Sequence, residues 1–93
     1  MMKHNAYFDG AVQSLSVEGH DKPATVGVMS KGEYEFGTAA PELMQVIAGE
    51  LIVKLPGSDE WQSFKSGTEF NVPGDSKFQL QVPVDTAYYC IYL

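Results

Sequence analysis

Arginine is absent from this 93-residue chain, and histidine and cysteine are scarce, with two copies and one copy respectively. Six lysines stand against twelve acidic residues, which gives a net charge of −6. A chain without a basic footprint is not expected to bind a nucleic acid polymer or an anionic membrane. It also lacks the side chain that binds phosphate in a bidentate way. Any phosphate must therefore be held by lysine or by backbone N–H groups.

Other features that the sequence lacks bear on the cellular compartment in which the protein is expected. Cys90 is the only cysteine, which excludes an internal disulfide and a zinc site built from cysteines. The opening stretch MMKHNAYFDG lacks the apolar segment of a secretory signal. No apolar run approaches the ~20 residues that a membrane-spanning helix needs. We therefore expect a reduced, soluble, cytoplasmic protein.

The chain does contain enough apolar material for one small core. Hydrophobic residues make up 44% of it, well above the range of disordered chains. A chain of this length buries only about 60–65% of its unfolded surface, so the core is thin. We expect a single domain over residues 1–93. The thin core, open sheet edges and an aromatic strand over residues 86–93 favour a homodimer.

Alternation of apolar and polar residues, typical of strands, recurs along the chain. Tyr34 and Phe36 alternate with Glu33 and Glu35, and similar runs lie at 11–17, 26–28, 42–48, 51–55, 70–72, 78–82 and 86–93. Glycine-rich and proline-rich turns separate them at spacings of about 8–12 residues. Only residues 40–48 also fit a helix, and we interpret them as a strand. About nine short antiparallel strands predict an all-β jelly-roll barrel whose inward polar residues are candidates for a site.

One stretch resembles the first motif of the cupin family. In GEYEFGTAAPELMQVIAG, Gly32, Glu42 and Gly49 fall where cupins have two glycines and a glutamate. Cupins also carry two alternating histidines here, but Thr38 and Ala40 occupy those positions. The spacing to Glu42 is shorter than usual. The likeness implies a cupin barrel with Glu42 on an inward strand.

The second cupin motif is matched in the same incomplete way. Gly67 and Pro73 in GTEFNVPG agree with it, while Phe78 lies where its histidine is expected. Of the residues that hold a cupin metal, only Glu42 remains, and one carboxylate cannot hold a transition metal. A metal-dependent oxygenase or isomerase is therefore the weakest functional interpretation, and no metal or other cofactor is expected.

Longer strings resemble one small family of single-domain cupins, the pyrimidine/purine nucleoside phosphorylases. They are VGVMSKGEYEFGTAAPELMQVIAGEL, LPGSDEWQ, GTEFNVPGDSKFQLQV and TAYYCIYL, and the likeness extends from about Tyr7 to Leu93. The resemblance implies phosphorolysis, in which a purine or pyrimidine nucleoside and orthophosphate give free base and ribose 1-phosphate. It fixes no catalytic residues.

Two polar residues are the catalytic candidates. A buried carboxylate at Glu42 could bind ribose hydroxyls and stabilise positive charge at the anomeric carbon, or it could be a structural carboxylate bound to a turn N–H. Gln45, three residues on, could donate to and accept from a base edge, or it could face solvent on a half-wet strand.

Aromatic residues are the candidates for the base. Tyr34, Phe36 and Phe78 could form an apolar wall that stacks on any base, although small barrels also need such residues as core. Trp61 is interpreted as a packing or interface residue.

Candidates for the phosphate are weaker. The turn Pro73–Ser76 could offer N–H groups as an anion nest, with the Ser76 hydroxyl and Lys77 nearby, but Asp75 would repel phosphate and a hairpin turn needs no function. Lys31 and Lys54 are alternatives. His4 and His20 lie in polar loops, and Cys90 is expected to be an inert buried thiol.

Two rivals to the enzyme remain open. A cupin that binds a small sugar or nucleobase without catalysis would show saturable binding and no turnover. An interaction module whose barrel is filled by its own side chains would have no cavity of ligand size.

Overall fold

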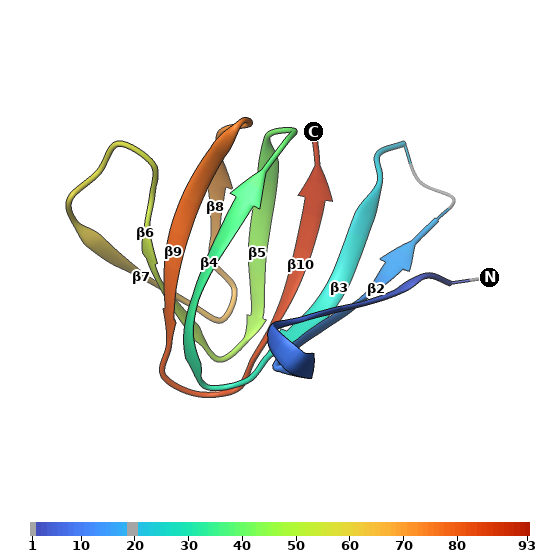
Figure 1. Ribbon diagram of the computed structural model, residues 1–93, viewed down its shortest axis with the longest axis horizontal. Coiled ribbons are helices and arrows are strands. Elements are labelled where there is room, and N and C mark those ends of the chain that lie inside the picture. The colour runs from blue at the N-terminus through green and yellow to red at the C-terminus, as the bar shows by residue number, and fades with distance from the viewer. Residues whose placement is uncertain (1, 19–20) are drawn as a thin grey trace.

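Two antiparallel sheets face each other in the computed structural model, which describes residues 2–18 and 21–93 (Figure 1). His20 lies outside the described residues. The elements in chain order are β1 (His4–Tyr7), the 3₁₀ turn η1 (Phe8–Gly10), β2 (Val12–Val17), β3 (Ala24–Met29), β4 (Gly32–Thr38), β5 (Glu42–Ala48), β6 (Glu50–Lys54), β7 (Trp61–Lys65), β8 (Glu69–Val72), β9 (Ser76–Val82) and β10 (Thr86–Tyr92).

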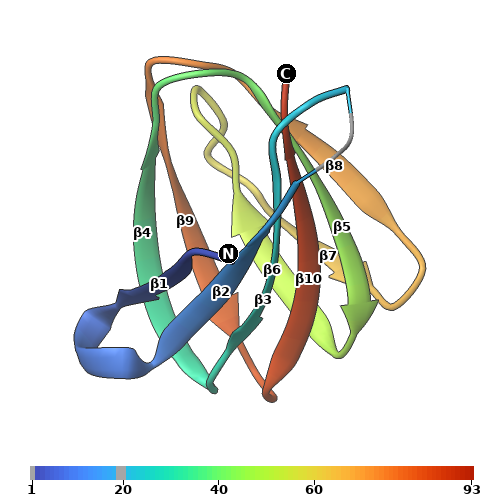
Figure 2. The ribbon, with the colours of Figure 1, turned by 90° about the vertical axis from the view of Figure 1, so that its right-hand side faces the viewer.

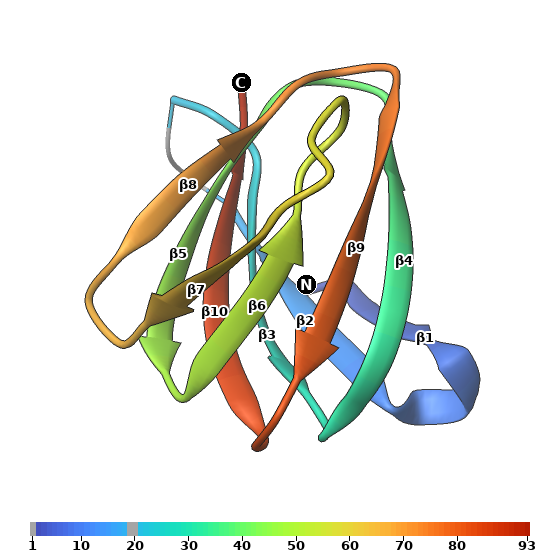
Figure 3. The same cartoon turned by 90° about the vertical axis from the view of Figure 1, so that its left-hand side faces the viewer.

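The sheets have six and four strands. The larger has the order β1-β2-β3-β10-β5-β8, and β10 runs between β3 and β5 in Figure 2. The smaller has the order β4-β9-β6-β7, seen side by side in Figure 3. This all-β barrel is the predicted architecture, and residues 42–48 form a strand rather than a helix.

The core lies between the sheets because apolar residues recur at every second position. On β9, Phe78, Leu80 and Val82 are buried, while Lys77 before them and Gln79 between them are exposed. The same alternation on neighbouring β6 and on strands of the facing sheet contributes further members of one cluster, Met29, Met44, Val46, Leu51, Val53, Phe70 and Val72. Because of this alternation, each sheet has one solvent-exposed face and one buried face.

Buried Thr86 stabilises the entry into β10. Its side chain is fully buried, and its Oγ1 accepts a hydrogen bond from the Glu50 backbone N–H at 3.1 Å. The same hydroxyl lies 2.8 Å from the Val84 carbonyl, to which it can donate. Gly49 has φ +102° and packs so closely that a Cβ there would lie 2.4 Å from Thr86 Oγ1. Glycine is therefore required at this position.

Alternation did not predict two of the strands. On β7, three successive residues starting at Trp61 are exposed, so the strand shows no apolar face in its sequence. β1 pairs only with β2, and most of it is exposed as well. Both are edge strands that form because their backbones pair with a neighbouring strand. Such pairing does not require alternating apolar and polar side chains, so the sequence pattern does not indicate it. In the part of the chain that the structure describes, no helix has the length and hydropathy to cross a membrane.

Candidate functional site

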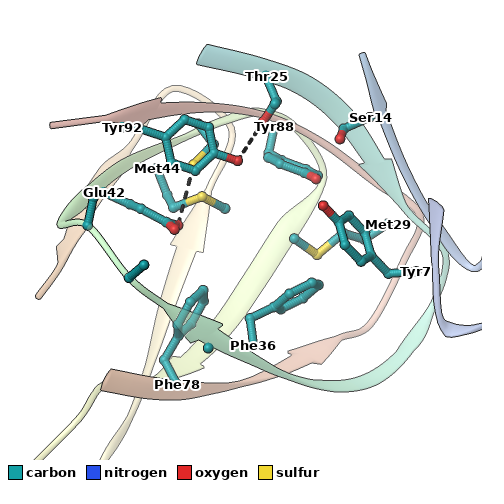
Figure 4. Close-up of a pocket in the computed structure, with 14 residues that line it drawn as sticks. Tyr7, Ser14, Thr25, Met29, Phe36, Glu42, Met44, Phe78, Tyr88 and Tyr92 are labelled. Atoms are coloured by element: carbon teal, nitrogen blue, oxygen red, sulfur yellow. Dashed lines mark hydrogen bonds between the residues drawn. The ribbon is translucent and has the colours of Figure 1, made fainter. Parts of the chain in front are cut away.

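A cavity of about 360 Å³ lies between the two sheets, lined by 14 residues (Figure 4). Its walls come from β1 to β5, from β9 and β10, and from the loop after β4. A space of this size matches small-molecule pockets. The interaction-module interpretation required a barrel filled by its own side chains, and this barrel is not filled.

The chemistry of the lining is unusual because none of the described residues around the cavity carries a side-chain nitrogen. Its polar groups are the hydroxyls of Tyr7, Ser14, Thr25, Tyr88 and Tyr92, the thiol of Cys90 and the carboxyl of Glu42. The lining thus offers no side-chain amide, imidazole or cation. A single carboxyl and a single thiol do not fit the imidazole-rich ligand set of a cupin metal, and no larger group of metal ligands occurs within residues 2–18 and 21–93.

Two of the three positions where cupins have histidines face the cavity. Ala40 and Phe78 line it, so apolar groups take the place of imidazoles there. Thr38 is buried elsewhere, and its hydroxyl donates to the Pro73 carbonyl at 2.7 Å. Two of the positions that hold a metal in cupins are therefore apolar parts of the cavity wall here.

Glu42 is the only ionisable carboxyl among the described lining residues, and it begins β5 directly after Pro41. It is half-buried, and the Cys90 thiol donates to its Oε1 over 3.4 Å. Burial raises the pKa of Glu42 above the ordinary value of 4.5, and the thiol hydrogen bond opposes this rise. Burial and the Glu42 charge also raise the pKa of Cys90, so the thiol stays protonated and serves as a donor.

Two hydroxyls extend this cluster along the wall. Tyr92 lies opposite Glu42 in the β10–β5 register, and its hydroxyl is 3.4 Å from that of Thr25 on β3 (Figure 4). Burial raises the pKa of Tyr92 to about 12, so its phenol remains neutral over the physiological range. This end of the cavity combines one carboxyl with neutral donors.

A second pair of hydroxyls depends on a glycine. Ser14 on β2, Gly27 on β3 and Tyr88 on β10 lie in one cross-strand row. A Cβ at Gly27 would lie 2.6 Å from both Cζ and the hydroxyl of Tyr88, so only glycine lets the phenol ring cross β3. The ring then carries its hydroxyl toward Ser14 (Figure 4). Burial raises the pKa of Tyr88 to about 12, against an opposing effect of the Ser14 hydroxyl.

Aromatic rings form the opposite wall. Phe36 on β4 and Phe78 on β9 are direct cross-strand partners, and their rings stack with centroids 5.9 Å apart at 28°. Tyr7 meets Phe36 edge-on, with centroids 6.2 Å apart. Both phenylalanines line the cavity. Tyr34 does not, because its hydroxyl donates to the Ser30 carbonyl at 2.7 Å and its ring packs on exposed Phe8.

Gln45 lies outside the cavity. Alternation along β5 turns it to the outer face of the sheet, and its Nε2 donates to Glu69 Oε1 at 3.3 Å. It therefore does not share a site with Glu42. Residues three apart on a strand point to opposite faces of the sheet, and Glu42 and Gln45 are three apart.

The Pro73–Ser76 turn does not form the predicted anion nest. The N–H groups of Asp75 and Ser76 already donate to the Ala39 carbonyl and to Thr38 Oγ1, both over 3.1 Å. The Ser76 hydroxyl donates to the Gly74 carbonyl at 2.9 Å. These three donors bind β4, the loop after β4 and the turn itself, so they do not point together at an anion.

The other predicted polar residues also lie away from the cavity. Lys31 and Lys77 are exposed, and neither they nor Lys54 lines it. His4 is exposed on β1 and hydrogen-bonds Gln13 over 3.0 Å. Trp61 lies on edge strand β7 and is 40% exposed, which makes it a surface residue.

Sequence reasoning missed most of the hydroxyls. Tyr88, Cys90 and Tyr92 alternate along β10, so one face of this aromatic strand could have been recognised as a polar lining. Ser14 and Thr25 carry no such signal, because they join the cavity only through the β2–β3–β10 register.

Comparison with known proteins gives a consistent result over the whole chain. The family model described as pyrimidine/purine nucleoside phosphorylase matches residues 2–92. A protein of that name from Pseudomonas entomophila is 64% identical over 99% of this chain and 98% of its own length. The crystal structure of a Vibrio parahaemolyticus protein of unknown function superposes with a TM-score of 0.96, at 49% identity, and covers 100% of this chain and 99% of that one.

More distant structures define the fold alone. A cupin superfamily protein from Desulfitobacterium hafniense is 14% identical and reaches a TM-score of 0.73 over 88% of this chain and 76% of its own. The architecture is thus that of a cupin. Together with the full-length match in sequence, this means that the chain belongs to the pyrimidine/purine nucleoside phosphorylase family.

Proposed function

We propose that this protein catalyses the phosphorolysis of purine and pyrimidine nucleosides to free base and ribose 1-phosphate. The observation that carries the proposal is the match of residues 2–92 to the family of that name. The cavity supports it, since its volume of about 360 Å³ is in the range of pockets for ligands of nucleoside size.

The cavity can hold a nucleoside in one orientation without selecting the base. The stacked Phe36–Phe78 pair offers a flat apolar surface on which any base can lie. No described lining residue has an amide or imidazole that would read the edge of one base and reject another. Acceptance of both purines and pyrimidines follows from this lack of polar discrimination at the base.

Glu42 is the group that we assign to the ribosyl centre. When the bond between sugar and base breaks, the anomeric carbon gains positive charge, and a nearby carboxylate stabilises it. Among the described lining residues Glu42 alone can supply a negative charge, and the Cys90 thiol holds its Oε1. The reaction is expected to proceed without a bound metal, with orthophosphate as the co-substrate.

We also propose that the protein acts in the cytoplasm as a homodimer. Support for the dimer comes from the outer face of the six-stranded sheet, where Leu15, Val26, Val28 and Ile47 are each more than 40% exposed. Sedimentation equilibrium checks the dimer, and a monomer mass at micromolar concentration would contradict it.

The first experiment is release of free base from uridine and from adenosine after treatment with EDTA, with phosphate present and then omitted. Phosphate-dependent release from both nucleosides is the expected result. Loss of activity that returns only when metal is restored would refute the metal-free reaction. Saturable nucleoside binding by folded protein with no release would instead identify a cupin that binds its ligand without catalysis.

A further inference from the structure

The cavity must accept an anion although no described lining residue is a cation. Glu42 adds a further difficulty, because its carboxylate repels phosphate at the end of the cavity where it lies. Phosphate is therefore expected to bind where hydrogen-bond donors gather on the side of the cavity away from Glu42. This argument rests on the proposed phosphorolysis.

Ser14, Tyr88 and Tyr7 provide such a place. In Figure 4, Ser14 and Tyr7 lie at the side of the cavity opposite Glu42, and the Tyr88 hydroxyl points toward them. Ser14 is 5% exposed and Tyr88 is 6% exposed, so both hydroxyls are shielded from bulk water. A hydroxyl donates more strongly to a charged acceptor than to a neutral one, and shielding from water strengthens the bond further.

Gly27 holds this group together. A side chain at Gly27 would collide with the Tyr88 ring and with the Gln13 carbonyl, which lies 2.8 Å from the position of a Cβ. A strand interior usually disfavours glycine. Its presence here, directly between Ser14 and Tyr88, keeps the phenol in the slot that brings the two hydroxyls together.

Tyr7 reaches the cavity through a strained connection. Phe8 and Asp9, which follow it, both have left-handed backbone conformations, with φ of +54° and +56°. Such conformations are unfavourable in residues other than glycine and persist only when the surroundings impose them. The Phe8 ring packs on Phe36 at 5.4 Å and thereby fixes the segment that presents Tyr7.

We propose that the hydroxyls of Ser14, Tyr88 and Tyr7 form the subsite for inorganic phosphate. Ser14 and Tyr88 come from the inner face of the six-stranded sheet, whereas the Phe36–Phe78 surface comes from the four-stranded sheet. Tyr7 lies where the two walls meet, because its ring contacts that of Phe36 edge-on. A ribose between the two walls has its base on one side and phosphate on the other, as in-line displacement requires.

The reaction balances in this geometry. A phosphate oxygen forms a bond to the anomeric carbon while the bond from that carbon to the base nitrogen breaks. The electron pair of the broken bond leaves with the base, and the proton that phosphate gives up is the one that the base gains. No oxidant or reductant takes part, and the three hydroxyls only hold and orient phosphate.

The test is steady-state kinetics on Tyr88→Phe with phosphate and uridine varied separately. The substitution keeps the ring in the Gly27 slot and removes one donor to a charged acceptor, so KM for phosphate should rise about tenfold or more. KM for uridine should change less than about twofold, because the nucleoside contacts remain. Tyr89→Phe is the matched control, since it makes the same chemical change one residue away on the outer face of β10.

The outcomes separate this subsite from the proposed function. An unchanged KM for phosphate in Tyr88→Phe, or an equal rise in Tyr89→Phe, would overturn the subsite while phosphorolysis by the wild type would stand. If the wild type released base at the same rate with and without phosphate, the proposed function would instead be overturned. Ser14→Ala is a second variant that alters no ring packing, and it should give the same selective rise in KM for phosphate.

Discussion

Replacing Glu42 by glutamine tests the centre of the proposed mechanism. The substitution keeps the shape of the side chain and removes the one negative charge among the described lining residues. Two unit charges 4 Å apart interact by about 4 kcal/mol at an effective dielectric constant of 20. A transition state with about half a positive charge on the sugar would therefore lose about 2 kcal/mol, which is about a 30-fold fall in kcat.

The assay is phosphate-dependent release of base, measured with both substrates saturating and across pH. For the wild type, the rate should fall on the acid side as Glu42 is protonated, at a pH above the ordinary 4.5 because burial raises its pKa. This fall in rate at low pH, the acid limb of the pH profile, should be absent in Glu42→Gln. A folded variant that keeps the wild-type kcat within about twofold, with the acid limb intact, would refute the role of Glu42.

The same variant has a predictable effect on stability. Because the pKa of Glu42 is raised in the folded protein, its protonated form stabilises the fold below about pH 4.5, and that contribution is lost as pH rises through the raised pKa. Glutamine is neutral at every pH. Glu42→Gln should therefore melt at a higher temperature than the wild type at pH 7 and at a similar temperature at pH 4. A lower melting temperature at pH 7 would contradict the burial argument.

Two further substitutions test the neighbouring contacts. Cys90→Ala removes the thiol donor that lowers the pKa of Glu42, so the fall in rate at low pH should move to higher pH. Cys90→Ser keeps a donor and should move this fall less. The same shift in both variants would contradict the role of the thiol. Thr86→Val leaves the part-buried Glu50 N–H without its partner and should cost about 2 kcal/mol, measured by urea unfolding. The control Thr68→Val, at an exposed position, should cost less than about 1 kcal/mol. Equal losses would refute the hydrogen-bond argument.

Local pattern predicted those parts of the fold in which one face of a strand is apolar. Phe78, Leu80 and Val82 show the period of two that placed them in the core, and the cupin-like spacing placed Glu42 on an inward face. The two phenylalanines of the wall were found in the same way. In each of these cases the information lies within one strand or one short continuous motif.

Contacts between distant strands could not be predicted in this way. Ser14 and Tyr88 meet because both pair with Gly27, and only the sheet register contains that information. The Ser76 turn failed as an anion site for a similar reason, since its N–H groups bind a loop from another part of the chain. Gln45 takes the solvent-facing alternative that the sequence left open, because it lies an odd number of residues from Glu42 on β5.

The position of β10 has a consequence for how the protein folds. This strand follows all the other described strands in the chain, yet it lies between β3 and β5 in the larger sheet. Until it inserts, β1, β2 and β3 are not joined to β5 and β8, and such non-local pairing makes folding slow. β10 also carries Tyr88, Cys90 and Tyr92 into the cavity. A nucleoside therefore cannot template an early intermediate and stabilises only the completed barrel.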